Sequence, residues 1–269
     1  MPPQNENATQ AEKGRDPDYV IRLRGLTKRF GRQVVFEGVN LDVVRGEILG
    51  IAGGSGTGKS VLLRSILGLL HYDAGRIEVF GQDISSLSVE ERLAVERRWG
   101  VLFQDGALFS SLSVLQNVEV PMREHMELPQ RLMDELALLK IAMVGLPADA
   151  AYKYPSELSG GMRKRAGLAR ALALDPEIVF LDEPTSGLDP IAAAAFDRLI
   201  RNLRQTLGLT VYMITHDLDS IFAVCDRVAV LADKHVVREG APRDIASNPG
   251  HPWVEEYFCG ERSRTVMKA

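Results

Sequence analysis

The feature that most constrains the fold is a glycine-rich loop between an apolar segment and an amphipathic one. The loop reads Gly53-Gly54-Ser55-Gly56-Thr57-Gly58-Lys59-Ser60 and fits the pattern G-x-x-x-x-G-K-[ST]. Residues 48–52 before it form a short apolar run typical of a strand buried on both faces, and helical spacing of apolar residues begins at about Ser60. A strand, a glycine-rich loop and a helix in this order predict one unit of a parallel α/β sheet. The alternative is a glycine-rich turn that matches the pattern by chance.

The residue types of this loop suit the binding of phosphate groups. Glycines let several backbone N–H groups face one anion, and the N-terminus of the following helix adds a partial positive charge. Lys59 can reach the terminal phosphates of a nucleotide, and the Ser60 hydroxyl can bind Mg²⁺.

Two acidic residues end a second apolar run, Ile178-Val179-Phe180-Leu181-Asp182-Glu183. The carboxyl ends of parallel strands meet at one edge of a sheet, so these carboxylates should lie beside the glycine-rich loop. Asp182 then suits a Mg²⁺ shell, and Glu183 is placed to polarise an attacking water. The alternative is a solvated strand end without chemical function.

The rest of the chain predicts an α/β fold with a mainly parallel sheet. Strand-like segments at 19–23, 34–36 and 39–43 indicate an N-terminal antiparallel β part. Helical spacing with several prolines predicts a helical subdomain at about 106–160, and strands and helices alternate from 159 to 239. We expect a disordered tail at 1–18, one domain over 19–245 and a C-terminal tail at 246–269, which could cap its own domain or reach a second copy.

Composition excludes several classes of protein. The 269 residues are 45% hydrophobic, which predicts a packed core. The sequence contains no run of about 18 apolar residues, so we expect no membrane-spanning helix. The polar start does not resemble a secretory signal, and Cys225 and Cys259 form no disulfide framework. With 32 Lys and Arg against 36 Asp and Glu, the net charge of −4 gives no broad attraction to nucleic acid, so we expect no nucleic-acid partner.

Over residues 20–245 these motifs resemble the nucleotide-binding subunits of ABC transporters, with residues 53–60 as the Walker A loop and 178–182 as Walker B. The remaining motifs of the family appear in its usual order: Phe30 as the aromatic that stacks on adenine, Gln104 as the Q-loop glutamine, Leu158-Ser159-Gly160-Gly161-Met162 as the signature segment, Ser186-Gly187-Leu188-Asp189 as the D-loop, and His216 as the switch histidine. Taken alone, Phe30 could be a core residue and His216 a structural histidine. Arg163-Lys164-Arg165, directly after the signature segment, could be a solvated basic face or could help to hold phosphate or a partner.

The resemblance implies ATP and Mg²⁺ as ligands and two ATP molecules held between two head-to-tail copies of the chain. The residues it assigns to ATP are Phe30, Gly53, Gly54, Ser55, Gly56, Thr57, Gly58, Lys59, Ser60, Val61, Gln104, Ser159, Gly160, Gly161, Asp182 and Asp189. It assigns Mg²⁺ to Ser60, Gln104 and Asp182, and catalysis to Glu183, His216 and Lys59.

Shorter matches point to one branch of the family. The segment from Gln104 to Val114, together with Arg163-Lys164-Arg165, is similar to ATPases of Mla- and Mce-type phospholipid transport systems. That branch implies a permease dimer docked on the apolar stretch 104–125, an Mce-domain lipid-binding protein, a STAS-domain protein, and a place on the cytoplasmic face of the inner membrane. The alternatives are another ABC importer or exporter, a soluble ABC-type ATPase acting on DNA or ribosomes, or a nucleotide sensor without hydrolysis.

Overall fold

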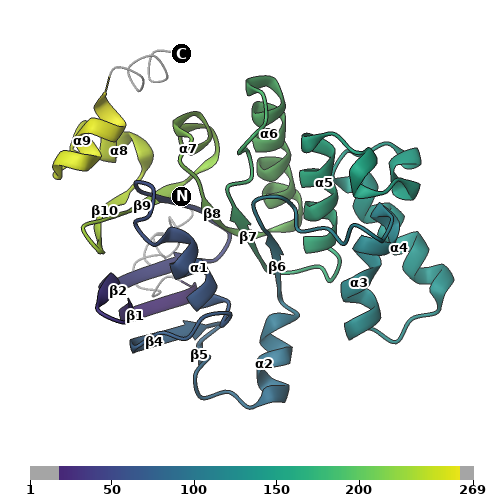
Figure 1. Ribbon diagram of the computed structural model, residues 1–269, viewed down its shortest axis with the longest axis horizontal. Helices are drawn as coiled ribbons and strands as arrows, with labels where there is room; N and C mark the ends of the chain where they lie inside the picture. The colour runs from purple at the N-terminus through teal and green to yellow at the C-terminus, as the bar shows by residue number, and fades with distance from the viewer. Residues whose placement is uncertain (1–17, 261–269) are drawn as a thin grey trace, which may run out of the picture.

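A computed structural model of the protein describes residues 18–260 (Figure 1). The larger of its two sheets has six strands in the order β10-β9-β3-β8-β7-β6, parallel except for the hairpin of β9 and β10. Its strands, in chain order, are β3 (Ile48–Ala52), β6 (Trp99–Leu102), β7 (Ile178–Asp182), β8 (Thr210–Ile214), β9 (Arg227–Ala232) and β10 (His235–Gly240). The predicted parallel α/β sheet is confirmed, and β3 lies near its centre with a hydrogen-bonded neighbour on each side.

The N-terminal part is a four-stranded antiparallel sheet in the order β2-β1-β4-β5. Its strands are β1 (Tyr19–Phe30), β2 (Gln33–Val44), β4 (Ala74–Val79) and β5 (Gln82–Asp83). The two segments predicted at 34–36 and 39–43 are one strand, because irregular register along the β1–β2 pair lets the chain pass Gly38 without ending the ladder.

Two hydrophobic cores lie on opposite sides of the large sheet, and β3 contributes to both. Leu49 and Ile51 pack with the N-terminal sheet and with α1 (Lys59–Ile66), whereas Ile48 and Ala52 face the core of the helical side. This alternation is the two-residue period of a strand buried on both faces.

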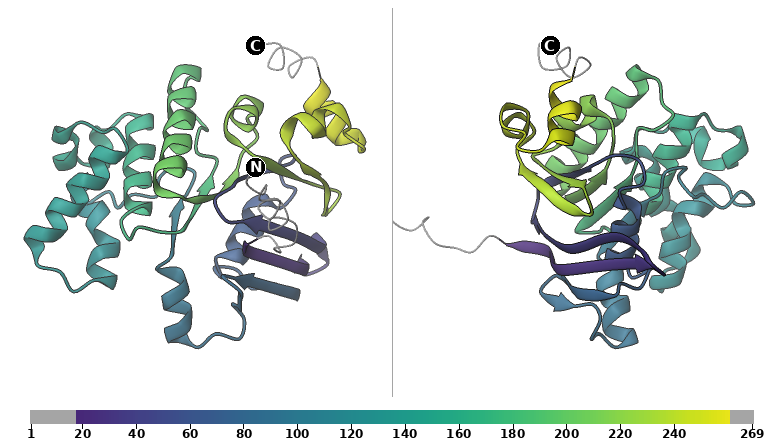
Figure 2. Two further views of the ribbon diagram at one scale, coloured as in Figure 1. Left: turned by 180° about the vertical axis from the view of Figure 1, so that it is seen from behind. Right: turned by 60° about the vertical axis from the view of Figure 1, so that its left-hand side comes forward.

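A helical subdomain forms one end of the molecule, at the right of Figure 1 and the left of the first view in Figure 2. It contains α3 (Val114–His125), α4 (Gln130–Met143), two 3₁₀ turns (Ala148–Tyr152 and Pro155–Glu157) and α5 (Gly160–Ala171). Ser113 begins α3 with a capping box, in which its hydroxyl accepts from the N–H of Gln116 and the Gln116 side chain accepts from the N–H of Ser113. A further helix, α2 (Val89–Glu96), precedes β6.

The last part of the chain closes the core beside β9 and β10. Its helices are α6 (Pro190–Leu207), α7 (Leu218–Val224), α8 (Pro242–Ser247) and α9 (Pro252–Cys259). Val254 and Phe258 of α9 are fully buried in the core of the same chain, so residues 252–259 cap their own domain. The expected disordered tail lies outside the described residues except for Asp18, and the boundary at 245 stays a prediction. No helix within residues 18–260 is long and apolar enough to cross a membrane.

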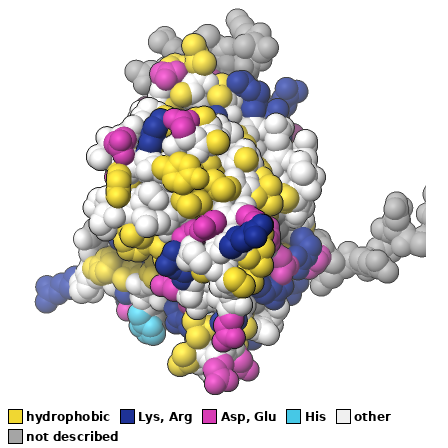
Figure 3. All heavy atoms as spheres, turned by 90° about the vertical axis from the view of Figure 1, so that its right-hand side faces the viewer, with side chains coloured by type: hydrophobic (Ala, Val, Ile, Leu, Met, Phe, Trp, Pro, Cys, Tyr) yellow, Lys and Arg dark blue, Asp and Glu magenta, His cyan; other side chains and the backbone are white. Residues whose placement is uncertain are grey.

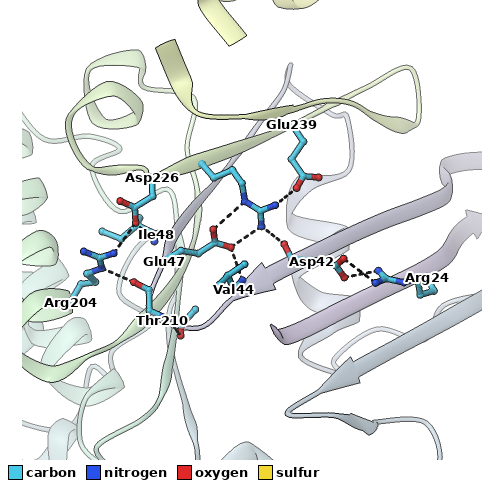
Figure 4. A network of polar contacts seen from close by, with 11 residues as sticks. Arg24, Asp42, Val44, Glu47, Ile48, Arg204, Thr210, Asp226 and Glu239 are labelled. Carbon is cyan, nitrogen blue, oxygen red and sulfur yellow. Dashed lines mark hydrogen bonds and ion pairs between the residues drawn. The ribbon is translucent and has the colours of Figure 1, made fainter. Parts of the chain in front are cut away.

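A polar network fixes the chain where it enters β3, at the end opposite the glycine-rich loop (Figure 4). The Arg227 guanidinium donates to both carboxylate oxygens of Glu47, to the backbone carbonyl of Asp42, and to Glu239. Arg204 donates to the Gly46 carbonyl at 2.6 Å. Because this network ties β2, β3, β9 and β10 together, it holds the two sheets in a fixed relation.

Candidate active site

The glycine-rich loop joins the carboxyl end of β3 to α1 and takes a conformation that only glycine tolerates at its first residue. Gly53 has a φ of +154°, and a Cβ atom there would overlap the carbonyl oxygen of Leu231 on β9. The loop is closed by Thr57, whose hydroxyl donates to the Gly54 carbonyl at 3.0 Å. The backbone N–H groups at the start of α1 therefore share one mouth with the loop, as anion binding requires.

Lys59 lies across this mouth. Its ammonium donates to the carbonyls of Gly53 and Gly54, at 2.8 Å each. Burial lowers the pKa of Lys59, while the nearby carboxylates of Glu183 and Asp182 act in the opposite direction. The ammonium is thus pre-positioned at the point where the terminal phosphates of a nucleotide would meet the loop.

Ser60 and Asp182 meet at the edge of the sheet, as the sequence predicts. The Ser60 hydroxyl lies 3.4 Å from the Asp182 Oδ1 atom, and Asp182 is 8% exposed at the end of β7. Burial, and then the charge of Glu183, raise the pKa of Asp182. The site offers two hard oxygen donors beside the glycine-rich loop, and burial there makes a carboxylate without a nearby cation unfavourable. These properties fit a Mg²⁺ ion.

Glu183 and His216 face each other across adjacent strands. Glu183 follows β7, His216 lies two residues after β8, and the Glu183 Oε2 atom is 2.7 Å from the His216 Nδ1 atom. Glu183 has a φ of +52°, which is unusual for a residue other than glycine, and its N–H donates to the Ile214 carbonyl at 2.9 Å. The strained backbone turns the carboxylate out of the sheet edge and toward the histidine.

A pocket of about 810 Å³ brings most of the predicted residues together. Its predicted lining residues are Phe30, Gly53, Gly54, Ser55, Gly56, Gly58, Lys59, Ser60, Val61, Gln104, Glu183 and His216. Phe30 is 49% exposed at its rim, with the Lys28 ammonium 5.0 Å from the ring centroid. Thr57 and Asp182 lie behind this lining, where they support the loop and Ser60.

The pocket also contains two aromatic residues to which the sequence assigned no role in the site. Trp253 and Tyr257 of α9 line it, with stacked rings whose centroids are 4.7 Å apart. The Trp253 Nε1 atom is 3.5 Å from the point that a Cβ atom on Gly54 would occupy. Their spacing of four residues on a short helix was the available signal, since it places both rings on one helix face.

Besides Thr57 and Asp182, four further predicted residues do not line this pocket. Ser159 begins α5, where its hydroxyl accepts from the N–H of Met162 at 3.2 Å, and Gly160 and Gly161 form the first turn. Asp189 begins α6 and accepts from the N–H groups of Ile191 and Ala192, at 3.0 Å each. The structure therefore contains two separate polar faces. One is the glycine-rich loop with the Glu183–His216 pair, and the other is formed by the N-termini of α5 and α6.

Comparisons with known proteins agree with this geometry. Residues 36–186 match the ABC transporter family. The chain is 42% identical over 226 residues to the intermembrane phospholipid transport system ATP-binding protein MlaF of Haemophilus influenzae, covering 84% of this chain and 85% of that protein. It is 42% identical over 250 residues to the probable ribonucleotide transport ATP-binding protein mkl of Mycobacterium leprae, covering 93% of this chain and 72% of that protein.

Among solved structures, the ATP-binding cassette MJ0796, described as a dimer in a post-hydrolysis state bound to ADP and phosphate, superposes with a TM-score of 0.75 at 31% identity. That match covers 82% of this chain and 98% of the cassette. The chain therefore belongs to the ABC transporter family, as an ATP-hydrolysing nucleotide-binding cassette.

Proposed function

We propose that this cassette powers the movement of phospholipid between the inner and outer membranes through a separate permease. The observation that carries the hydrolytic part is the Glu183–His216 pair beside Lys59 and the Ser60–Asp182 pair. The phospholipid part is supported by similarity to MlaF over most of both chains. The name of the mycobacterial relative makes ribonucleotide transport the second candidate.

In the proposed reaction, the loop N–H groups and Lys59 hold the phosphates, and Phe30 stacks on the adenine. Glu183 accepts a proton from the attacking water, and His216 holds Glu183 in place and contacts the terminal phosphate. Ser60, Asp182 and Gln104 would hold Mg²⁺, which would supply positive charge against the phosphates.

The face formed by the N-termini of α5 and α6 suits a second copy of the chain. Ser159, Gly160 and Gly161 present a helix N-terminus, which favours a phosphate group, yet they do not line their own chain's pocket. A head-to-tail dimer would bring this face, with Asp189, over the ATP of the other copy. The solved structures of a related cassette, which are described as dimeric, support the pairing of two copies.

The helical subdomain offers a surface for the permease. Figure 3, which faces this end of the molecule, shows hydrophobic side chains gathered among charged ones. Its exposed large hydrophobic residues include Phe109, Leu139, Tyr152 and Tyr154, and Phe109 belongs to the predicted docking stretch. An apolar surface rimmed by charge is typical of a partner site. The proposal places the cassette at the cytoplasmic face of the inner membrane, with an Mce-domain protein and a STAS-domain protein as further partners.

The test is purification of the tagged chain from detergent-solubilised membranes, with mass spectrometry of proteins and lipids and an ATPase assay on the eluate. A permease with an Mce-domain protein and bound phospholipid, and hydrolysis lost in Glu183→Gln, is the expected result. A permease with a nucleoside-binding partner would favour the ribonucleotide candidate. Ribosomes or DNA-binding proteins without any permease would refute the transport proposal.

A further inference from the structure

Lys164 occupies an unusual position in the middle of the cassette. It lies on α5, its residue is 6% exposed, and its ammonium donates to the backbone carbonyls of Gln104 and Glu183, at 2.8 Å each. Burial lowers the pKa of Lys164, which shows that the site is costly for a charge. A lysine held in such a place by two backbone carbonyls is more than a solvated basic residue.

One of these carbonyls belongs to the strained residue of the site. Glu183 holds a φ of +52°, and its peptide groups are bonded on both sides, by its N–H to Ile214 and by its carbonyl to Lys164. Such a backbone conformation persists only where several surrounding contacts hold it in place. Lys164 is therefore part of what aims the Glu183 carboxylate at His216.

The other carbonyl belongs to a segment that is clamped against α5. A Cβ atom on Gly167 would lie 2.7 Å from the Leu102 Cδ1 atom and 3.0 Å from the Gly106 Cα atom, so the two backbones approach closely. Arg170 donates to the carbonyls of Gly106 and Ala107, at 2.8 Å and 2.7 Å. Because α5 and residues 102–107 are joined at Lys164, Gly167 and Arg170, they should move as one body.

We propose that Lys164 is a positioning residue that couples the signature helix α5 to Glu183 and Gln104. The inference rests on the proposed head-to-tail dimer, in which Ser159 at the start of α5 faces one ATP while Glu183 and Gln104 face the other. A shift of α5 on engaging one nucleotide then reaches the catalytic carboxylate of the second site through a single side chain. Lys164 should support turnover and cooperativity between the sites, with little effect on ATP binding.

The test compares three variants of the full chain in ATPase assays without lipid or permease. Lys164→Met keeps the unbranched apolar stem of the side chain and removes its donors, and Lys164→Arg restores donors. Lys140→Met is the matched control, because Lys140 is also a buried lysine, 4% exposed and paired with Asp175, on a different helix. Unfolding by urea is measured for all three variants.

We expect Lys164→Met to lower kcat by roughly 10- to 100-fold, the cost of misplacing a catalytic group by about 1 Å, with KM changed by less than about threefold. The Hill coefficient for ATP should fall to about 1, the value for independent sites. Lys164→Arg should recover most of the turnover, and Lys140→Met should lose stability but keep kcat.

Turnover of Lys164→Met within about twofold of the unmodified chain would overturn the inference, as would an equal loss of kcat in Lys140→Met. A rise in KM for Lys164→Met without a change in kcat would also overturn it. Since the assay contains only ATP, a failure here leaves the phospholipid proposal standing, and failure to recover a permease leaves the role of Lys164 standing.

Discussion

Replacing Asp197 with asparagine should stabilise the protein more at pH 8 than at pH 5. Asp197 lies on α6, is 5% exposed, and accepts from the Ser220 hydroxyl at 2.8 Å. Its Oδ1 atom is buried without a hydrogen-bond partner among residues 18–260. Burial, with a smaller contribution from the charge of Asp217, raises the pKa of Asp197 to about 6.

The sign follows from the difference between the folded and unfolded states. As pH rises through 3.8, the unfolded carboxyl group loses its proton, whereas the folded one keeps it until about pH 6. The free energy of unfolding therefore falls by on the order of 3 kcal/mol across this window, at 1.36 kcal/mol per pKa unit. Above about pH 6 it no longer changes with the titration of this group. Between pH 5 and pH 8 the unmodified chain should still lose about 1 kcal/mol of stability from this group, and Asp197→Asn should not show this loss.

The measurement is urea unfolding, followed by circular dichroism, at pH 5, 6, 7 and 8. The difference in unfolding free energy between Asp197→Asn and the unmodified chain isolates this group from all others that titrate. Asp219→Asn is the matched control, since Asp219 is an exposed acid near the same network. A difference for Asp197→Asn that is constant from pH 5 to pH 8 would refute the assignment of a raised pKa to Asp197.

Three further predictions concern the pocket. Glu183→Gln should lower kcat by roughly 10²- to 10⁴-fold, because it removes the proposed general base, while equilibrium binding of ATP is retained. Turnover near normal would show that another group activates the water. Phe30→Ala should weaken the binding of ATP and of GTP alike, by roughly 5- to 100-fold in titration calorimetry. The reason is that stacking uses the ring face of a base, which adenine and guanine share. A loss of affinity confined to ATP would contradict this. In a Trp99→Phe background, ATP should change the fluorescence of Trp253, which lines the pocket, and an unchanged spectrum would place the nucleotide elsewhere.

The sequence predicts best those parts of the site whose chemistry and local structure coincide. The loop at 53–60 needs glycines, lysine and serine in a fixed order, and the acids at 182 and 183 follow an apolar run typical of a buried strand. The start of α6 also has clear sequence signals, because Asp189 caps the helix and Pro190 occupies its first turn.

The parts that the sequence could not predict depend on tertiary packing between distant segments. Trp253 reaches the pocket only because α9 buries Val254 and Phe258 against the core, about 200 residues from the loop it approaches. Arg163-Lys164-Arg165 has the composition of a solvated face, yet the packing of α5 against residues 102–107 buries the middle residue and leaves Arg163 exposed. Charge runs alone do not distinguish these two outcomes.

The central place of β3 also determines when during synthesis the nucleotide pocket can form. Its two neighbours, β8 and β9, begin at Thr210 and Arg227, so a nascent chain carries this apolar strand unpaired while more than 150 further residues are made. Gly53 gains its contact with the Leu231 carbonyl only after β9 has left the ribosome. Until then ATP has no finished site and cannot stabilise the chain, so the ligand can protect the newly made protein from aggregation only after β9 is in place.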